Sequence, residues 1–65
     1  MDSEKLKIAM LESEINVTDL AKKVGFTRAT FYNKVAGKSK FKKSEKIVIA
    51  GILGLGEEQL KEIFE

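Results

Sequence analysis

The side chains best suited to chemistry lie between residues 25 and 43, in the stretch GFTRATFYNKVAGKSKFKK. This stretch holds one arginine, five lysines and no acid, although the whole chain has a formal net charge of only +2. Lysine and arginine neutralise phosphate groups, and arginine and asparagine can each form paired hydrogen bonds with the edge of a base. Because Arg28 and Asn33 stand among these cations, the stretch indicates a surface that binds nucleic acid.

The charge is unevenly divided along the chain. Residues 22–46 carry nine cations and a single acid, Glu45, which gives this segment a net charge of +8. The remainder carries three cations and nine acids, a net charge of −6. Such a division favours a nucleic-acid face from which acids are excluded. The alternative is that the lysines form an ordinary solvated surface.

Catalysis is poorly supported by the composition. The chain contains no histidine and no cysteine, so it lacks the commonest general base, the commonest metal ligand and any thiolate site. The run GILGLG lacks the Lys-Ser/Thr pair that a phosphate-binding loop needs. Glu57 and Glu58 are adjacent, so they point about 100° apart on a helix. We therefore expect no enzyme activity, no metal site and no cofactor.

The elements that must position the basic segment are helices, because helical periodicity runs through nearly the whole chain. A chain of 65 residues forms one domain at most, so residues 1–65 are expected to be a single DNA-binding domain. The first expected helix begins near Ser3, and the other four cover about 17–24, 28–36, 43–53 and 57–64. The expected N-caps are Ser3, Asn16, Thr27 and Gly56. The apolar run IVIAGILGL fits a strand or a helix, but no second strand candidate exists to pair with it. The sequence thus predicts an all-α, compact bundle of five short helices.

Residues 17–37 have the pattern of a helix-turn-helix. Two helices that cross steeply need a small residue in the first helix, and Ala21 occupies that place. The turn needs a residue that tolerates a positive φ, and Gly25 follows four residues later. Leu20 and Val24 form one apolar face of the first helix. Phe31 and Val35 form the apolar face of the second helix and are expected to pack against it.

The second helix of this motif has one face suited to reading bases. When Phe31 and Val35 point inward, Ala29, Asn33 and Ala36 lie on the opposite side at 100° per residue. Small residues let a helix settle deeply in the major groove, and the first residues of the recognition helix reach the bases. The predicted base contacts are Thr27, Arg28, Ala29, Tyr32 and Asn33.

The lysines beyond this helix are expected to position the protein on DNA rather than to read its sequence. They follow the recognition helix, where the chain should pass beside the sugar-phosphate backbone. Phe41, the one aromatic residue among them, is expected to point into the core. The predicted phosphate contacts are Thr18, Lys34, Lys38, Lys40, Lys42 and Lys43.

The stretch VTDLAKKVGFTRATFYNKVAGK, residues 17–38, resembles the core of the Cro/CI-type (Xre-like) helix-turn-helix family. KIVIAGILGLGEEQLKEIF, residues 46–64, resembles the fourth and fifth helices of that family. Within the family the chain is most similar to small Cro-like regulators of temperate phages. The resemblance implies a lambda-repressor-like bundle that binds operator DNA in the major groove, usually as a dimer. Val17 stands where the family often has glutamine, and Lys34 where it often has an apolar residue.

These patterns predict a sequence-specific DNA-binding transcriptional regulator, either a repressor or a Cro-like competitor, whose partner is double-stranded operator DNA. Ile63 and Phe64 are apolar near the chain end and could form a weak homodimer through the C-terminal helix, although a core this small could equally use both side chains internally. The alternative is a modulator or antirepressor that uses the same fold to bind another regulator, for instance a phage regulator. Three apolar features motivate this alternative: the wide stripe of the first helix, the uncharged run 47–56, and the residues Leu60, Ile63 and Phe64 near the chain end.

A membrane role is not expected. The longest uncharged run, Ile47 to Gly56, has ten residues, whereas a bilayer-spanning helix needs about 20. The N-terminal segment begins with an acid and its apolar residues are interrupted by charges, which is unlike a secretory signal. The expected location is the cytoplasm of a prokaryotic cell or of a phage-infected host.

Overall fold

Short turns connect five helices in the computed structural model, which describes residues 1–64. The helices are α1 (Ser3–Glu12), α2 (Val17–Val24), α3 (Arg28–Val35), α4 (Lys43–Leu53) and α5 (Glu57–Phe64). Residues 1–64 contain no strand. The predicted all-α bundle of five helices is therefore confirmed, and the apolar run IVIAGILGL belongs to α4 and the turn that follows it.

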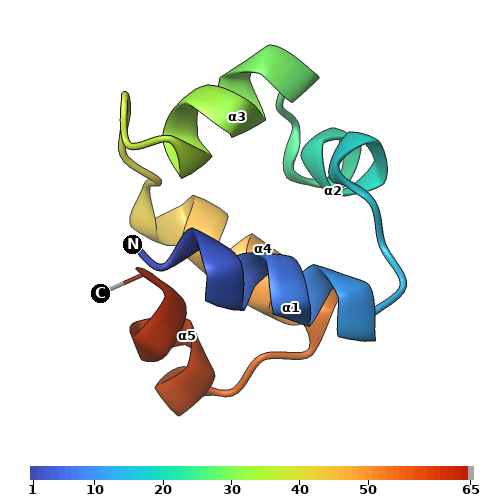
Figure 1. Ribbon diagram of the computed structural model, residues 1–65, viewed down its shortest axis with the longest axis vertical. Helices are drawn as coiled ribbons and strands as arrows, with labels where there is room; N and C mark the ends of the chain where they lie inside the picture. The colour runs from blue at the N-terminus through green and yellow to red at the C-terminus, as the bar shows by residue number, and fades with distance from the viewer. Residues whose placement is uncertain (65) are drawn as a thin grey trace.

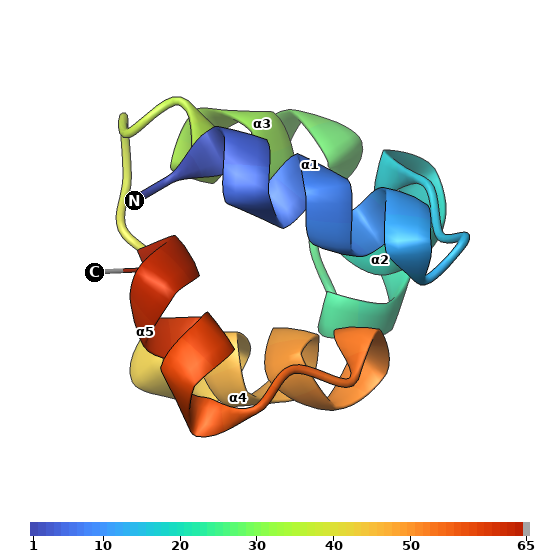
Figure 2. The ribbon, with the colours of Figure 1, turned by 60° about the horizontal axis from the view of Figure 1, so that its bottom comes forward.

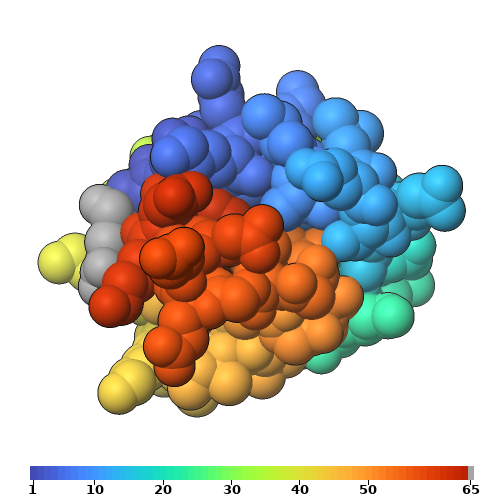
Figure 3. Space-filling view, turned by 90° about the horizontal axis from the view of Figure 1, so that it is seen from below, coloured from blue at the N-terminus to red at the C-terminus, as the bar shows by residue number. Residues whose placement is uncertain are grey.

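α2 and α3 form a corner on one side of the molecule, and α1, α4 and α5 complete the bundle (Figure 1). α2 contacts both α3 and α4, while α5 contacts α1 and α4 (Figure 2). Seen from below, α5 lies between α1 and α4 (Figure 3). The two ends of the described chain meet, because the Asp2 N–H donates to the carbonyl oxygen of Ile63 at 2.7 Å. One side of α3 faces away from the rest of the bundle (Figure 1).

The core is a single cluster to which every helix contributes. Leu20 of α2 and Ile49 of α4 are fully buried, and Phe31 of α3 is 1% exposed. Phe41, between α3 and α4, also points inward as predicted and is 8% exposed. Its ring meets those of Phe31 and Phe64 edge-on, at centroid distances of 6.1 and 5.2 Å. The aromatic ring of Phe41 therefore anchors the α3–α4 connection to the core.

Two predicted helix boundaries are wrong by one residue. The N-cap of α1 is Asp2 rather than Ser3, since the Asp2 carboxylate accepts the Lys5 N–H at 3.1 Å. Both residue types cap helices well, and the long-range bond from the Asp2 N–H holds this residue outside the helix. α3 ends at Val35 rather than Ala36, because the chain then turns through Gly37 at φ 85°. The predicted caps Asn16 and Thr27 each accept a backbone N–H, as expected.

The turn between α2 and α3 depends on a left-handed residue. Gly25 has φ 96°, a conformation that costs a residue with a Cβ appreciably more than glycine. The Gly25 N–H donates to the Lys22 carbonyl at 3.2 Å, and the Phe26 N–H donates to the Ala21 carbonyl at 2.8 Å. This pair of bonds is the Schellman arrangement, which satisfies the last carbonyls of a helix. The predicted αL turn at Gly25 is confirmed.

Ala21→Leu is expected to destabilise the domain by about 1–3 kcal/mol, because Ala21 is 1% exposed beneath the α2–α3 corner. The free energy of unfolding would be measured by urea titration followed by circular dichroism. Lys22→Leu is the matched control, since it adds the same side chain at an exposed position of the same helix. An Ala21→Leu protein as stable as the original would contradict close packing at this corner.

α4 is only partly buried despite its apolar sequence. Ile49 and Leu53 belong to the core, whereas Ile47 and Val48 are 57% and 43% exposed. Residues 1–64 include no helix that is long and apolar enough to cross a membrane.

Candidate nucleic-acid interface

The outward face of α3 has the composition that the sequence predicted. Phe31 is buried and Val35 packs against the core, so the opposite side of the helix is turned to solvent. All five predicted base contacts are exposed: Thr27, Arg28, Ala29, Tyr32 and Asn33. Only small and polar side chains occupy the centre of this face, so nothing bulky prevents a close approach to a groove.

Arg28 and Tyr32 lie one turn apart on the same flank of α3. The guanidinium carbon of Arg28 is 5.6 Å from the centroid of the Tyr32 ring, within the range of a cation–π contact. Tyr32 itself is 47% exposed. This contact places the guanidinium group beside the Tyr32 ring, on the exposed side of α3.

Thr27 has a structural role as well as an exposed position. Its hydroxyl oxygen accepts the Thr30 N–H at 3.1 Å, and its O–H donates to the Thr30 hydroxyl oxygen at 2.9 Å. These bonds cap the N-terminus of α3 and fix where the helix begins. The start of α3 is therefore well defined, and Arg28 and Ala29 follow immediately in its first turn.

A two-helix corner that exposes such a face is the arrangement of a DNA-binding helix-turn-helix. Comparison with family models agrees, since the model for the Cro/C1-type HTH DNA-binding domain matches residues 5–64. The chain belongs to this family. No curated protein and no solved structure gives a significant match. Cro/C1-type domains bind DNA and are typically not enzymes.

The loop of the Cro/C1-type domain that follows α3 presents a row of lysines. This loop, residues 36–42, is called the basic loop below, and Lys43 is the first residue of α4. Because Phe41 is buried, its neighbours Lys40 and Lys42 are directed outward on either side. The exposed lysines here are Lys38, Lys40, Lys42 and Lys43. Thr18, in the first turn of α2, is also exposed.

Lys34 is the exception among the predicted phosphate contacts. Its side chain is only 11% exposed and lies beneath the basic loop. The Nζ donates to the carbonyl oxygen of Lys40 at 2.9 Å and is 3.5 Å from Oε1 of Glu45. It is also 5.2 Å from the centroid of the Phe26 ring. The charge of Lys34 is thus directed to partners within the protein, and its contact with a phosphate stays a prediction.

Glu45 is the residue that sequence reasoning did not assign to the site. Its carboxylate accepts the backbone N–H of Lys42 at 2.7 Å and so satisfies one of the free donors at the start of α4. Two signals in the sequence pointed to it. Glu45 is the one acid within residues 22–46, and it stands three residues after the N-cap, where a glutamate commonly bonds back to the cap.

The C-terminal helix does not expose the apolar residues that were expected to form a dimer contact. Ile63 and Phe64 are 3% and 9% exposed and belong to the core. A core of this size needs both side chains, and Phe64 packs against Phe41. A second copy of the chain could reach these side chains only if the core opened.

An apolar groove of about 530 Å³ lies between α1 and α3, beside the start of α2. Met10, Val35 and Tyr32 are among the residues that line it. Leu11, at its edge, is 69% exposed, and Ile8 of the same helix is 54% exposed. The apolar stripe of α1 is thus wider than its contacts within the bundle require.

Proposed function

We propose that this protein is a sequence-specific transcriptional regulator, a repressor or a Cro-like competitor, in which α3 enters the major groove of operator DNA. The observation that carries the proposal is the exposed face of α3, where Arg28 and Asn33 flank small residues. Arginine pairs with the N7 and O6 atoms of guanine, asparagine with N6 and N7 of adenine, and alanine contacts the thymine methyl group. Thr27 and Tyr32 complete the proposed base-reading set.

The exposed lysines of the basic loop and Lys43 extend this surface toward the phosphates. They emerge where α3 ends, and so they would meet the DNA backbone next to the groove that α3 occupies. Thr18, at the start of α2, would contact a phosphate on the other side of the corner. One such face covers a short half-site, so we propose a weak dimer that tightens on a palindromic operator. We place this regulator in the cytoplasm of a prokaryotic cell or phage-infected host.

Selection from a random duplex library tests the proposal directly. The bound sequences would be determined first, and affinity for the selected and a scrambled duplex would then be measured at several salt concentrations. We expect a palindromic consensus and a steep loss of affinity with salt, because phosphate contacts release counterions. Salt-sensitive binding without a consensus would show that the protein binds DNA non-specifically and is not a sequence-specific regulator. Failure to bind any duplex would favour a modulator that binds another regulator, with the groove between α1 and α3 as the surface to mutate.

The combined change Lys40→Ala and Lys42→Ala is expected to weaken binding to every duplex by the same factor. Each phosphate contact contributes about 0.9 to the slope of log K against log salt, so the slope should flatten by about 1.8. Both replacements keep the backbone groups that bond to Lys34 and Glu45. Lys5→Ala with Lys61→Ala is the matched control, because it removes two exposed charges from α1 and α5. An unchanged salt slope in the Lys40→Ala, Lys42→Ala protein would show that the basic loop does not contact the phosphates.

A further inference from the structure

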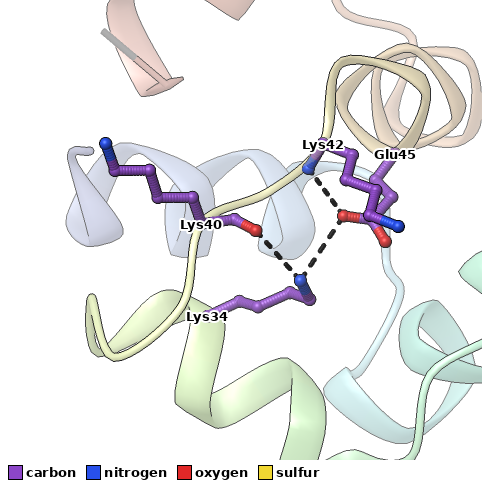
Figure 4. Close-up of polar contacts among 4 residues, drawn as sticks. All are labelled: Lys34, Lys40, Lys42 and Glu45. Carbon is purple, nitrogen blue, oxygen red and sulfur yellow. Dashed lines mark hydrogen bonds and ion pairs between the residues drawn. The ribbon is translucent and has the colours of Figure 1, made fainter.

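α3, the basic loop and the start of α4 meet at the ammonium group of Lys34 and the carboxylate of Glu45. Lys34 of α3 reaches under the basic loop, where its Nζ lies 2.9 Å from the Lys40 carbonyl oxygen and 3.5 Å from Oε1 of Glu45 (Figure 4). The same Oε1 accepts the backbone N–H of Lys42 at 2.7 Å. Figure 4 shows the Lys40 side chain extending away from this cluster while its carbonyl faces Lys34.

The cluster is shielded from solvent although it lies close to the surface. The Lys34 and Glu45 side chains are 11% and 17% exposed. The rings of Phe26 and Phe41 lie 5.2 and 5.9 Å from the Lys34 Nζ. Salt therefore screens this ion pair less than it would screen an exposed pair.

We propose that Lys34 and Glu45 act as a clamp that holds the backbone of the basic loop and thereby positions its lysines against the phosphates. The proposal has two parts, and the second rests on the proposed DNA-binding function. Two of the clamp's bonds end on backbone groups, those of Lys40 and Lys42, so they restrain the path of the chain itself. Phe41, between these two residues, fixes the loop from the core side. A loop ordered before binding loses less conformational entropy when it meets DNA.

The clamp also explains why a basic segment retains one acid. Glu45 is paired with Lys34, and the two charges largely cancel within the protein. Neither residue then contributes much to the field at the DNA surface, and the free charge is left to the exposed lysines. If Glu45 were only an acid near the phosphates, its removal would tighten binding. If it is part of the clamp, its removal weakens binding even though the segment becomes more positive.

The first test uses the free protein and needs no DNA. Backbone ¹⁵N relaxation would be measured for Lys34→Met, Glu45→Ala and Glu45→Gln. Order parameters of residues 38–42 are expected to fall from about 0.85 toward 0.6 in Lys34→Met and Glu45→Ala, with the helices unchanged. The change in Glu45→Gln should be smaller, because glutamine can still accept the Lys42 N–H. Unchanged order in the loop of all three variants would overturn the clamp.

Lys34→Met is useful because its loss of function is not expected to come from unfolding. Methionine has a similar length and can pack on Phe26 and Phe41. Glu45 loses its charge partner, but at 17% exposed its carboxylate still reaches water and still accepts the Lys42 N–H. Thermal unfolding of each variant would be recorded beside the relaxation data. Should Lys34→Met fail to fold, Glu45→Ala and Glu45→Gln still decide the question.

The second test measures binding of these variants to the duplex selected by the original protein. We expect Glu45→Ala to bind about threefold to tenfold more weakly, with a flatter salt slope, and Glu45→Gln to lie between Glu45→Ala and the original. Glu58→Ala is the matched control, since it removes an exposed acid from the first turn of α5. Tighter binding by Glu45→Ala would overturn the positioning role. Absence of binding by the original protein would refute the proposed function instead, while the relaxation data would still decide whether the clamp holds the loop.

Discussion

Phe41→Ala is expected to lower the free energy of unfolding by about 3–5 kcal/mol. Phe41 is 8% exposed, and its ring contacts Phe31 and Phe64 edge-on, with Phe26 at a centroid distance of 6.3 Å. Truncation removes three aromatic contacts and leaves a cavity at the meeting point of α3, the basic loop and α5. Small domains have little stability to lose, so a large part of this variant should be unfolded at 37 °C.

Urea titration, with the slope m compared between proteins, would measure this loss. Tyr32→Ala is the matched control: it removes an aromatic ring from the exposed face of α3 and should change stability by about 0.5 kcal/mol or less. Phe41→Ala should therefore lower the free energy of unfolding, whereas Tyr32→Ala should alter the DNA-binding face with little loss of stability. A cost below about 1 kcal/mol for Phe41→Ala would mean that the ring does not anchor the loop to the core.

The combined change Arg28→Ala and Asn33→Ala is expected to have the largest effect on sequence-specific binding. Each bidentate contact with a base contributes about 1–3 kcal/mol of discrimination, so affinity for the selected duplex should fall by about 2–6 kcal/mol. Both side chains are exposed on α3, and stability should change little. Affinity for a scrambled duplex should fall much less, because the lysines of the basic loop remain.

The measurement is a pair of titrations, one with the selected duplex and one with the scrambled duplex. Repeating the library selection with the variant should show a relaxed preference at two positions of each half-site. Arg28→Lys supplies the control for charge, because lysine keeps the cation but loses the planar fork that pairs with guanine. An equal loss on both duplexes would show that Arg28 and Asn33 contact phosphates and do not read bases.

The helices and the exposed face of α3 could be predicted because the forces behind them are local. Asn16, Thr27 and Gly25 stop or start helices through bonds to residues within a few positions, and the structure confirms all three. The periodicity of Phe31 and Val35 likewise turns one side of α3 inward and leaves Asn33 outside. Errors at Ser3 and Ala36 amount to one residue, since neighbouring positions could cap or end the helix almost equally well.

Features that depend on contacts between distant segments could not be predicted from the sequence. Ile63 and Phe64 could serve either a dimer contact or the core, and the fold places both in the core, where Phe64 packs against Phe41. Nor did the periodicity of the apolar run in α4 show which of its sides is covered: Ile49 and Leu53 belong to the core, whereas Ile47 and Val48 are exposed. Glu14 adopts a positive φ of 55° without being glycine, in a turn where the Ser13 hydroxyl donates to the carbonyl oxygen of Leu53, 40 residues away.

Lys34 shows most clearly where local reasoning ends. As a lysine between Asn33 and the basic loop, it was assigned to the phosphates with its neighbours. Its ammonium group turns inward because the returning chain brings the Lys40 carbonyl and the Glu45 carboxylate to it, 6 and 11 residues further along. The sequence by itself determined the five helices, the αL turn at Gly25, the aromatic anchor at Phe41 and the exposed face of α3. Only the tertiary structure decided which cation is held inside the protein, because a charge takes the partners that folding places within its reach.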